Sequence, residues 1–240
     1  MAESEWGTIL EDLQHLCEEF PTGIVAIGGV AVWLHTKKYL DDQLLQGSHD
    51  ADFYMSLQDY SQLTDLYEVT RNNRLGKSQI VQNGTDFDVY VEGQSRLAVS
   101  YAQAQRYSEE IGGIRCVCRE HLLVLKGRAY EDRQGSAKGR KDAKDIGKLF
   151  VLLSEDANRK PEALSGLREE DLRLFGQVVG DPEVFNEMAL QNRHWGKQLR
   201  DMAKRGLQYV EASQKHLYRA PYRAPSTVSR GRTKKPDIGI

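Results

Sequence analysis

The sequence predicts an α/β (α+β) fold, in which a mixed sheet with flanking helices is followed by a region of helices only. Short apolar runs alternate with helical patterns before residue 118, and an Asn-Gly pair joins two of those runs. After residue 118, apolar residues recur only at helical spacing. These periods separate the two element types, because side chains alternate along a strand and repeat about every 3.6 residues along a helix.

The composition is that of an ordinary globular protein with an uneven charge. The 240 residues suffice for one large domain or two small ones, and the net charge of −2 excludes a bulk attraction of the whole chain to nucleic acid. Residues 219–240 nevertheless hold six Arg or Lys and one acid. With Tyr218 and Tyr222, this basic tail either follows a nucleic-acid backbone, contacts an acidic partner or is a solvated terminus, and we favour the solvated terminus.

The number of cysteines and the lengths of the apolar runs indicate in which cellular compartment the protein is expected. Cys17, Cys116 and Cys118 are an odd set with one close pair, which does not make a disulfide framework. Buried strand cysteines in a reducing cytoplasm are the simplest interpretation. No run approaches the length needed to cross a bilayer, so we expect a cytoplasmic protein without a membrane partner.

Helices and strands alternate in the first half of the predicted fold. An amphipathic helix over residues 4–20 ends at Pro21-Thr22-Gly23, and the wholly apolar residues 24–28 form a buried strand. After it we expect a helix at 30–37, a polar link at 38–48, a strand at 51–56, a helix at 58–70, strands at 78–82 and 85–91, a polar helix or loop at 96–110 and a strand at 114–118.

Asn83-Gly84 is the strongest local signal in the chain, because Asn-Gly between two apolar runs favours a tight hairpin turn. The strand after the turn has one apolar face and one polar face, formed respectively by Phe87, Val89, Val91 and by Asp86, Asp88, Tyr90. Asp88 is the stronger candidate for a site residue, because apolar residues flank it and it lies deeper in the strand than Asp86.

Helical spacing continues to residue 217. Pro161 and Pro182 are signals for helix starts, and the predicted helices cover 119–130, 140–154, 161–177, 183–189 and 190–217. We therefore expect three parts, a core over 1–118, a helical domain over 119–217 and a flexible basic tail over 218–240.

Two glycines and two aspartates mark the candidate site. Gly28 and Gly29 lie where the first strand passes into a helix, a place where backbone N–H groups can approach a phosphate. Asp50 and Asp52 are two residues apart at the start of the next strand, so they share one of its faces. Two carboxylates aimed at one point suit a hard divalent cation such as Mg²⁺.

This pattern, Gly-Gly at a strand-to-helix turn and then Ser-x-Asp-x-Asp, resembles the nucleotidyltransferase superfamily with its polymerase-β-like fold. The resemblance implies a minimal nucleotidyltransferase sheet core and an NTP substrate. It implies that Asp50, Asp52 and Asp88 hold two Mg²⁺ (or Mn²⁺) ions. Asp88 would also assist loss of the proton from the attacking hydroxyl. Gly28, Gly29 and Ser48 would hydrogen-bond the phosphates.

A second group of charged residues follows residue 118. Lys126 and Arg133 are seven residues apart and share a helix face, and so do Asp142 and Asp145, which are three apart. Lys141 precedes Asp142. Spacing alone does not decide between a structural ion-pair cluster and a phosphate site.

The segment with Leu-Lys, then Arg, then Lys-Asp-x-x-Asp resembles the closing motif of AbiEii-type nucleotidyltransferase toxins. By this resemblance Lys126 contacts nucleotide phosphates, and Asp142 supports catalysis or orients Lys126. Arg133 is included among the nucleotide-binding residues, although it and Asp145 look more architectural.

The expected function is metal-dependent transfer of a nucleoside monophosphate from an NTP to an acceptor. By resemblance the acceptor is a tRNA 3′ end or a protein hydroxyl, and the setting is a toxin–antitoxin or phage-defence system, with a cognate antitoxin as a candidate partner. The competing hypothesis is a non-catalytic module that keeps the fold for binding or regulation.

Overall fold

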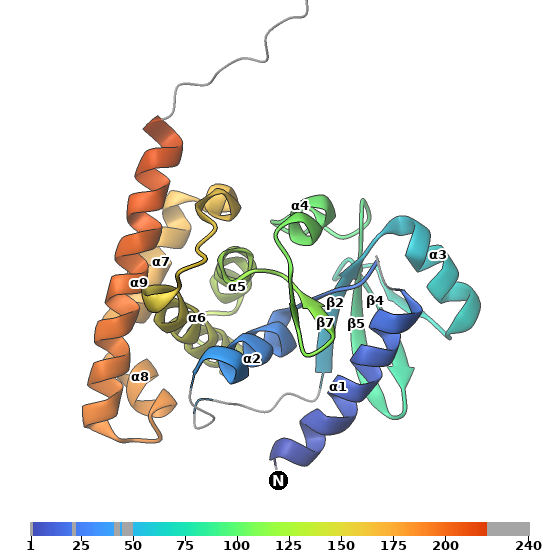
Figure 1. Ribbon diagram of the computed structural model, residues 1–240, viewed down its shortest axis with the longest axis horizontal. Coiled ribbons are helices and arrows are strands. Elements are labelled where there is room, and N and C mark those ends of the chain that lie inside the picture. The colour runs from blue at the N-terminus through green and yellow to red at the C-terminus, as the bar shows by residue number, and fades with distance from the viewer. Residues whose placement is uncertain (1, 21–22, 41–43, 45–49, 220–240) are drawn as a thin grey trace, which may run out of the picture.

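The computed structural model describes residues 2–20, 23–40, 44 and 50–219. Within them, seven strands form one mixed sheet in the order β3-β4-β5-β2-β1-β7-β6 (Figure 1). β2 pairs in parallel with β5, and β1 pairs in parallel with β7, whereas the remaining pairs are antiparallel. The strands are β1 (Val25–Ile27), β2 (Asp50–Met55), β3 (Thr70–Asn72), β4 (Lys77–Gln82), β5 (Thr85–Val91), β6 (Glu109–Ile111) and β7 (Ile114–Cys116).

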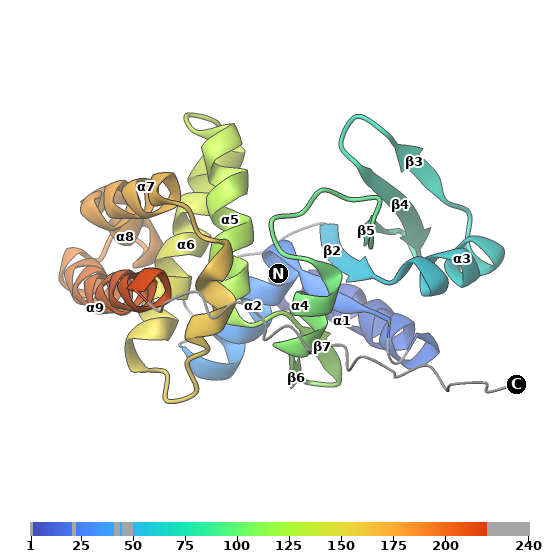
Figure 2. The ribbon, with the colours of Figure 1, turned by 90° about the horizontal axis from the view of Figure 1, so that it is seen from above.

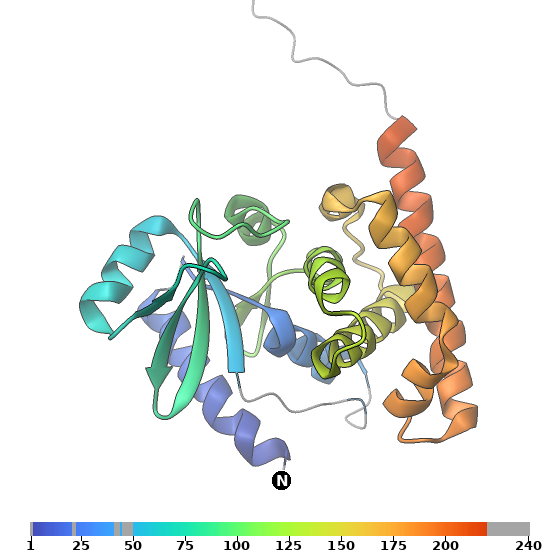
Figure 3. The same ribbon diagram turned by 180° about the vertical axis from the view of Figure 1, so that it is seen from behind.

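Helices flank the sheet and then form a group of their own. Those of the first half are α1 (Ala2–Glu19), α2 (Gly28–Tyr39), α3 (Leu57–Leu66) and α4 (Tyr101–Arg106). Those of the second half are α5 (Arg119–Arg133), α6 (Ala137–Glu155), the 3₁₀ helix η2 (Pro161–Gly166), α7 (Glu169–Gly180), α8 (Pro182–Met188) and α9 (Arg193–Arg219). Figures 2 and 3 show α5 and α6 between the sheet on one side and α9 on the other.

The core of the sheet is apolar and tightly covered. Phe53 of β2 and Phe87 of β5 are fully buried, as are Leu13 and Leu16 on the inner face of α1. A buried hydrogen bond of 2.8 Å between Tyr60 Oη and Ser78 Oγ ties α3 to β4. Burial of each of these large side chains stabilises the fold by about 1.5–3 kcal/mol. This packing holds β2 and β5 in a fixed position.

The predicted α/β (α+β) class, a mixed sheet with flanking helices followed by a helical region, is confirmed by this arrangement. The predicted hairpin is confirmed as well. Asn83 and Gly84 both have positive φ, 48° and 83°, as a tight turn with two left-handed residues requires. Both faces of β5 are as the alternation predicts, because its apolar side chains are buried and Asp86 is exposed.

The prediction of one helix over 161–177 is wrong. Leu167 and Arg168 have extended backbone between η2 and α7. Asp171 explains the break, because its carboxylate accepts a hydrogen bond of 2.7 Å from the Arg168 backbone N–H and so starts a new helix.

Two short strands were not predicted. β3 and β6 have three residues each and are largely polar, so neither carries an alternating apolar signal. Each pairs antiparallel with a longer or more apolar neighbour, β4 or β7, at an edge of the sheet.

Parts of the predicted link and tail lie outside the described residues, namely 41–43, 45–49 and 220–240, while α9 continues to Arg219. Across the described residues, none of the helices combines the length and apolarity that crossing a membrane requires.

Candidate active site

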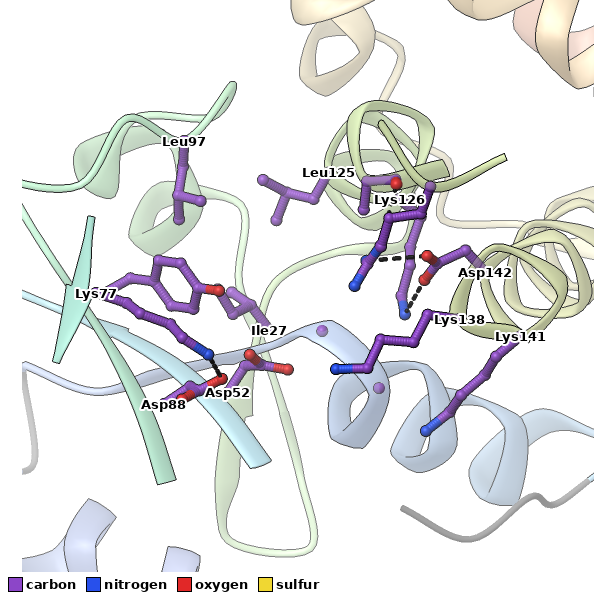
Figure 4. Close-up of a pocket in the computed structure, with 15 residues that line it drawn as sticks. Ile27, Asp52, Lys77, Asp88, Leu97, Leu125, Lys126, Lys138, Lys141 and Asp142 are labelled. Carbon is purple, nitrogen blue, oxygen red and sulfur yellow. Dashed lines mark hydrogen bonds and ion pairs between the residues drawn. The ribbon is translucent and has the colours of Figure 1, made fainter. Parts of the chain in front are cut away.

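Asp52 and Asp88 lie side by side on two parallel strands. The register of β2 and β5 pairs Asp52 with Asp88, and Asp50 with Asp86. Because positions two apart on a strand share a face, all four backbone positions belong to one face of the sheet. Asp52 and Asp88 line one cavity of about 270 Å³, shown in Figure 4. The structure does not describe the side chain of Asp50, and Ser48 lies outside the described residues.

Gly28 and Gly29 line this cavity where β1 passes into α2. β1 passes into α2 at Gly28, whose φ of +64° favours glycine, and Ile27 lies opposite Asp52 in the sheet. A β-carbon at Gly28 would overlap the carboxylate of Asp52. Ile27, the N-cap residue of α2, has no polar side chain for the first N–H groups of the helix, which suits them to an anion.

The opposite wall of the cavity is basic. It is formed by α5, which supplies Lys126 and Arg133, and by the first turns of α6, which supply Lys138, Lys141 and Asp142. Ser136 starts α6 by accepting a hydrogen bond of 3.0 Å from the Gly139 N–H, which places Lys138 in the first turn. Figure 4 shows Lys138 extending from α6 toward Asp52.

Lys126 is held between two carboxylates of α6. Its Nζ lies 3.1 Å from Asp142 Oδ1 and 2.7 Å from Asp145 Oδ2. Asp142 Oδ2 also lies 2.9 Å from Nη2 of Arg133, and Lys148 Nζ lies 3.5 Å from Asp145 Oδ1. The structure therefore brings together all four residues that the spacing grouped, with Lys148 as an addition.

Lys126 and Asp145 keep their charges. Burial by itself lowers the pKa of Lys126, but the nearby Asp145 and Asp142 outweigh it and raise the pKa above its usual value. Burial raises the pKa of Asp145, but Lys126 and Lys148 outweigh it and lower that pKa. Lys126 is therefore a fixed cation at neutral pH.

The cavity has more basic than acidic side chains, and most of the basic ones come from the helix wall. Among the described side chains that line it, three are acidic and five are basic: Asp52, Asp88 and Asp142, and Lys77, Lys126, Arg133, Lys138 and Lys141. The two acids on the sheet face the basic helix wall. Two carboxylates on the sheet opposite four cations on the helices suit a ligand that carries phosphates together with a metal ion, although Lys77 on the sheet and Asp142 on the helices carry the opposite charges.

Carboxylate oxygens are the donors that Mg²⁺ and Mn²⁺ prefer, so the chemistry of Asp52 and Asp88 fits such an ion. Among the side chains that the structure describes, no three His, Cys, Asp or Glu lie close enough together to hold a metal. The third predicted ligand, Asp50, is not among those side chains. The assignment of all three as metal ligands stays a prediction.

Lys77 and Gln79 of β4 are site residues that the sequence did not reveal. Lys77 forms an ion pair with Asp88, and Gln79 Nε2 donates a hydrogen bond of 2.9 Å to Asp88 Oδ1. A signal was present, because a two-residue Asn-Gly turn fixes the hairpin register. That register places Gln79 opposite Asp88 and Lys77 on the same face.

No family model matches the chain, and no curated protein matches it. Among solved structures it is similar to an antigenic nucleotidyltransferase-like protein from Paracoccidioides brasiliensis, with 16% identity, a TM-score of 0.49, and 79% of this chain and 94% of the other covered. A Megavirus polyadenylate synthase is 16% identical, with a TM-score of 0.46 and coverage of 73% and 39%. JHP933 from Helicobacter pylori is 15% identical, with a TM-score of 0.44 and coverage of 90% and 95%.

The predicted closeness to AbiEii-type toxins stays a prediction. The function of this chain is therefore argued from the side chains of the cavity.

Proposed function

We propose that the protein is a nucleotidyltransferase that moves a nucleoside monophosphate from an NTP to an acceptor hydroxyl. One observation carries the proposal: Asp52 and Asp88, paired in register, and basic side chains of α5 and α6 line one cavity together with Gly28 and Gly29. We assign residues 1–118 to the nucleotidyltransferase core and 119–217 to the helical domain, with the active site between them.

In this reaction the acceptor oxygen forms a bond to the α-phosphorus, the bond from that phosphorus to the bridging oxygen breaks, and pyrophosphate leaves. The hydroxyl gives up its proton to a base, the role proposed for Asp88. Both the attacking and the leaving oxygen carry negative charge in the transition state, so positioned cations lower the barrier. A bound Mg²⁺ or Mn²⁺ would supply a Lewis acid at these oxygens.

The proposed roles follow from the two walls. Asp50, Asp52 and Asp88 would hold the divalent metal ions, and Asp88 would also assist loss of the proton from the attacking hydroxyl. The backbone of Gly28 and Gly29 would bind phosphate oxygens together with Ser48.

On the helix wall, Lys138 and Lys141 face the same space as point charges for the triphosphate. Lys126 and Arg133 add positive charge, and Asp142 holds both in place.

The test is incubation of the purified chain with each α-³²P-labelled NTP, Mg²⁺, total tRNA and a protein extract. We expect label on an acceptor, and we expect Asp52→Asn and Asp88→Asn to abolish it. Asp86→Asn is the matched control, because it removes the same charge from an exposed position on the same strand face. Equal loss in the Asp86 variant would contradict the proposal.

The label also decides the finer questions that rest on the resemblance alone. Label on RNA would support a tRNA 3′ end as acceptor, and label on protein would support a side-chain hydroxyl. A toxin role and a cognate antitoxin would then be tested by expression of the chain in growing cells.

The alternative is a non-catalytic binding module. The ion pair of Lys77 with Asp88 favours it, because it occupies an acid that the reaction would use. NTP binding without any labelled product would support this alternative.

A further inference from the structure

Asp88 carries a counter-ion from its own sheet. Lys77 contacts Asp88 Oδ2, while Gln79 donates to Oδ1 at 2.9 Å, so both carboxylate oxygens have a partner on β4. The side chains of Lys77 and Asp88 are only 15% and 9% exposed. Figure 4 shows the Lys77 ammonium reaching Asp88 beside Asp52.

The position of this ammonium is set by the sheet. The antiparallel register of β4 and β5 places Gln79 opposite Asp88. Lys77 precedes Gln79 by two residues on β4 and therefore lies on the same face of the sheet. The Asn83-Gly84 turn fixes that register. Lys77 is therefore preorganised against Asp88 before any ligand enters.

A cation in this position competes with a divalent ion. Mg²⁺ binds carboxylate oxygens at about 2.0–2.1 Å, so an ion at Asp88 would meet the Lys77 ammonium at contact distance, and like charges repel in a partly buried site. The described lining already has five basic side chains against three acidic ones. A second divalent ion would add to that excess.

We propose that Lys77 is a positioning residue that takes the place of a second divalent ion at Asp88, so that the site binds one divalent ion with its nucleotide, at Asp50 and Asp52. The inference rests on the proposed function and adds to it the number of divalent ions that the site binds. Asp88 and Lys77 then form an ion pair without net charge beside the attacking oxygen.

The test counts bound Mn²⁺ on the full chain by electron paramagnetic resonance, with the α,β-methylene analogues of the four NTPs offered one at a time. We expect one Mn²⁺ for the native chain and for Lys77→Arg, which keeps the charge. We expect two Mn²⁺ with spin coupling for Lys77→Met, because neighbouring ions in a two-metal site are only about 3.5–4 Å apart.

Lys204→Met is the matched control, because it removes the same charge from an exposed position on α9, and it should keep one ion. Lys77→Gln replaces Lys77→Met if circular dichroism shows that the methionine variant does not fold.

Two ions in the native chain would overturn the inference and leave the proposed function in place. One ion in the neutral variants would also overturn it, because Lys77 would then not be what excludes the second. No nucleotide-dependent Mn²⁺ in any variant would overturn the inference together with the proposed function.

Discussion

Lys126 and Asp145 form a buried ion pair, with Nζ of the lysine 2.7 Å from Oδ2 of the aspartate. The pair joins α5 to α6 in the wall of the cavity, and Asp142 shares the same ammonium. Charges buried in this way stabilise a fold only while every partner is present, because the loss of one leaves another unpaired in a medium of low polarity. The cluster therefore ties the position of the helices to the chemistry of the site.

Replacing Lys126 by Met should destabilise the protein by up to about 3–5 kcal/mol, because it leaves the buried Asp145 with only Lys148 and the buried Asp142 with only Arg133 as a cationic partner. Urea unfolding followed by circular dichroism measures this change. Lys144→Met is the control, since Lys144 pairs with the half-buried Glu187 at 3.5 Å, and we expect a loss of at most about 1 kcal/mol. Equal losses in the two variants would contradict a structural role for Lys126.

Gly28→Ala should reduce both stability and nucleotide binding. The positive φ alone costs an alanine about 1–2 kcal/mol, and the new β-carbon must also displace the Asp52 carboxylate. Gly112→Ala is a matched control, because Gly112 has a similar φ of 58° with open space around its β-carbon position. Thermal unfolding and nucleotide titration of both variants separate backbone strain from the effect on Asp52. A Gly28 variant that binds nucleotide as the Gly112 variant does would contradict the role assigned to this glycine.

The parts of the site that the sequence predicted depend on local periodicity. Alternation along residues 85–91 was enough to place Asp88 on the polar face, because every second residue of this short stretch is apolar and marks the opposite, buried face. Asp52 could be assigned for the same reason. Lys77 could not be found in this way, because its importance comes from a partner eleven residues away across the hairpin.

The ion pairs between α5 and α6 show a second limit of prediction from the sequence. Spacing put Lys126 and Arg133 on one face of a helix, and it left open whether they formed a structural cluster or a phosphate site. The packing of α5 against α6 supplies the missing information, and it gives Lys126 both a structural partnership and a place on the cavity. The edge strand β3 escaped prediction because pairing with β4, not its own sequence, determines it.

Stability should fall as the pH drops from about 6.5 toward 4. Burial lowers the pKa of His35 to about 4 despite its hydrogen bond to Val117 and the nearby Glu109, and burial with the nearby Lys160 lowers the pKa of His121 to about 4. Below about pH 6.5 the unfolded chain takes up protons that the folded chain does not, so each histidine costs up to about 3 kcal/mol by pH 4.

Urea unfolding at pH 7 and pH 5 measures this loss. His121→Phe keeps a ring without a titrating group, so its stability should depend less steeply on pH. If the free energy of unfolding of this variant changed with pH as steeply as that of the native chain, His121 would not be a group that gains a proton on unfolding.

Lys138→Met should weaken binding of an NTP about fivefold while leaving binding of the matching nucleoside monophosphate unchanged. The reason is that Lys138 extends toward Asp52 from the first turn of α6, where its charge would meet the β- and γ-phosphates of the proposed substrate. A charge-assisted contact at an exposed position contributes about 1 kcal/mol, which corresponds to that factor. Calorimetric titration at two salt concentrations measures both affinities, and the difference should shrink at high salt. Lys197→Met, on α9, is the control for the charge change alone. Equal weakening of both nucleotides would instead place Lys138 at the part that they share, the nucleoside and its α-phosphate.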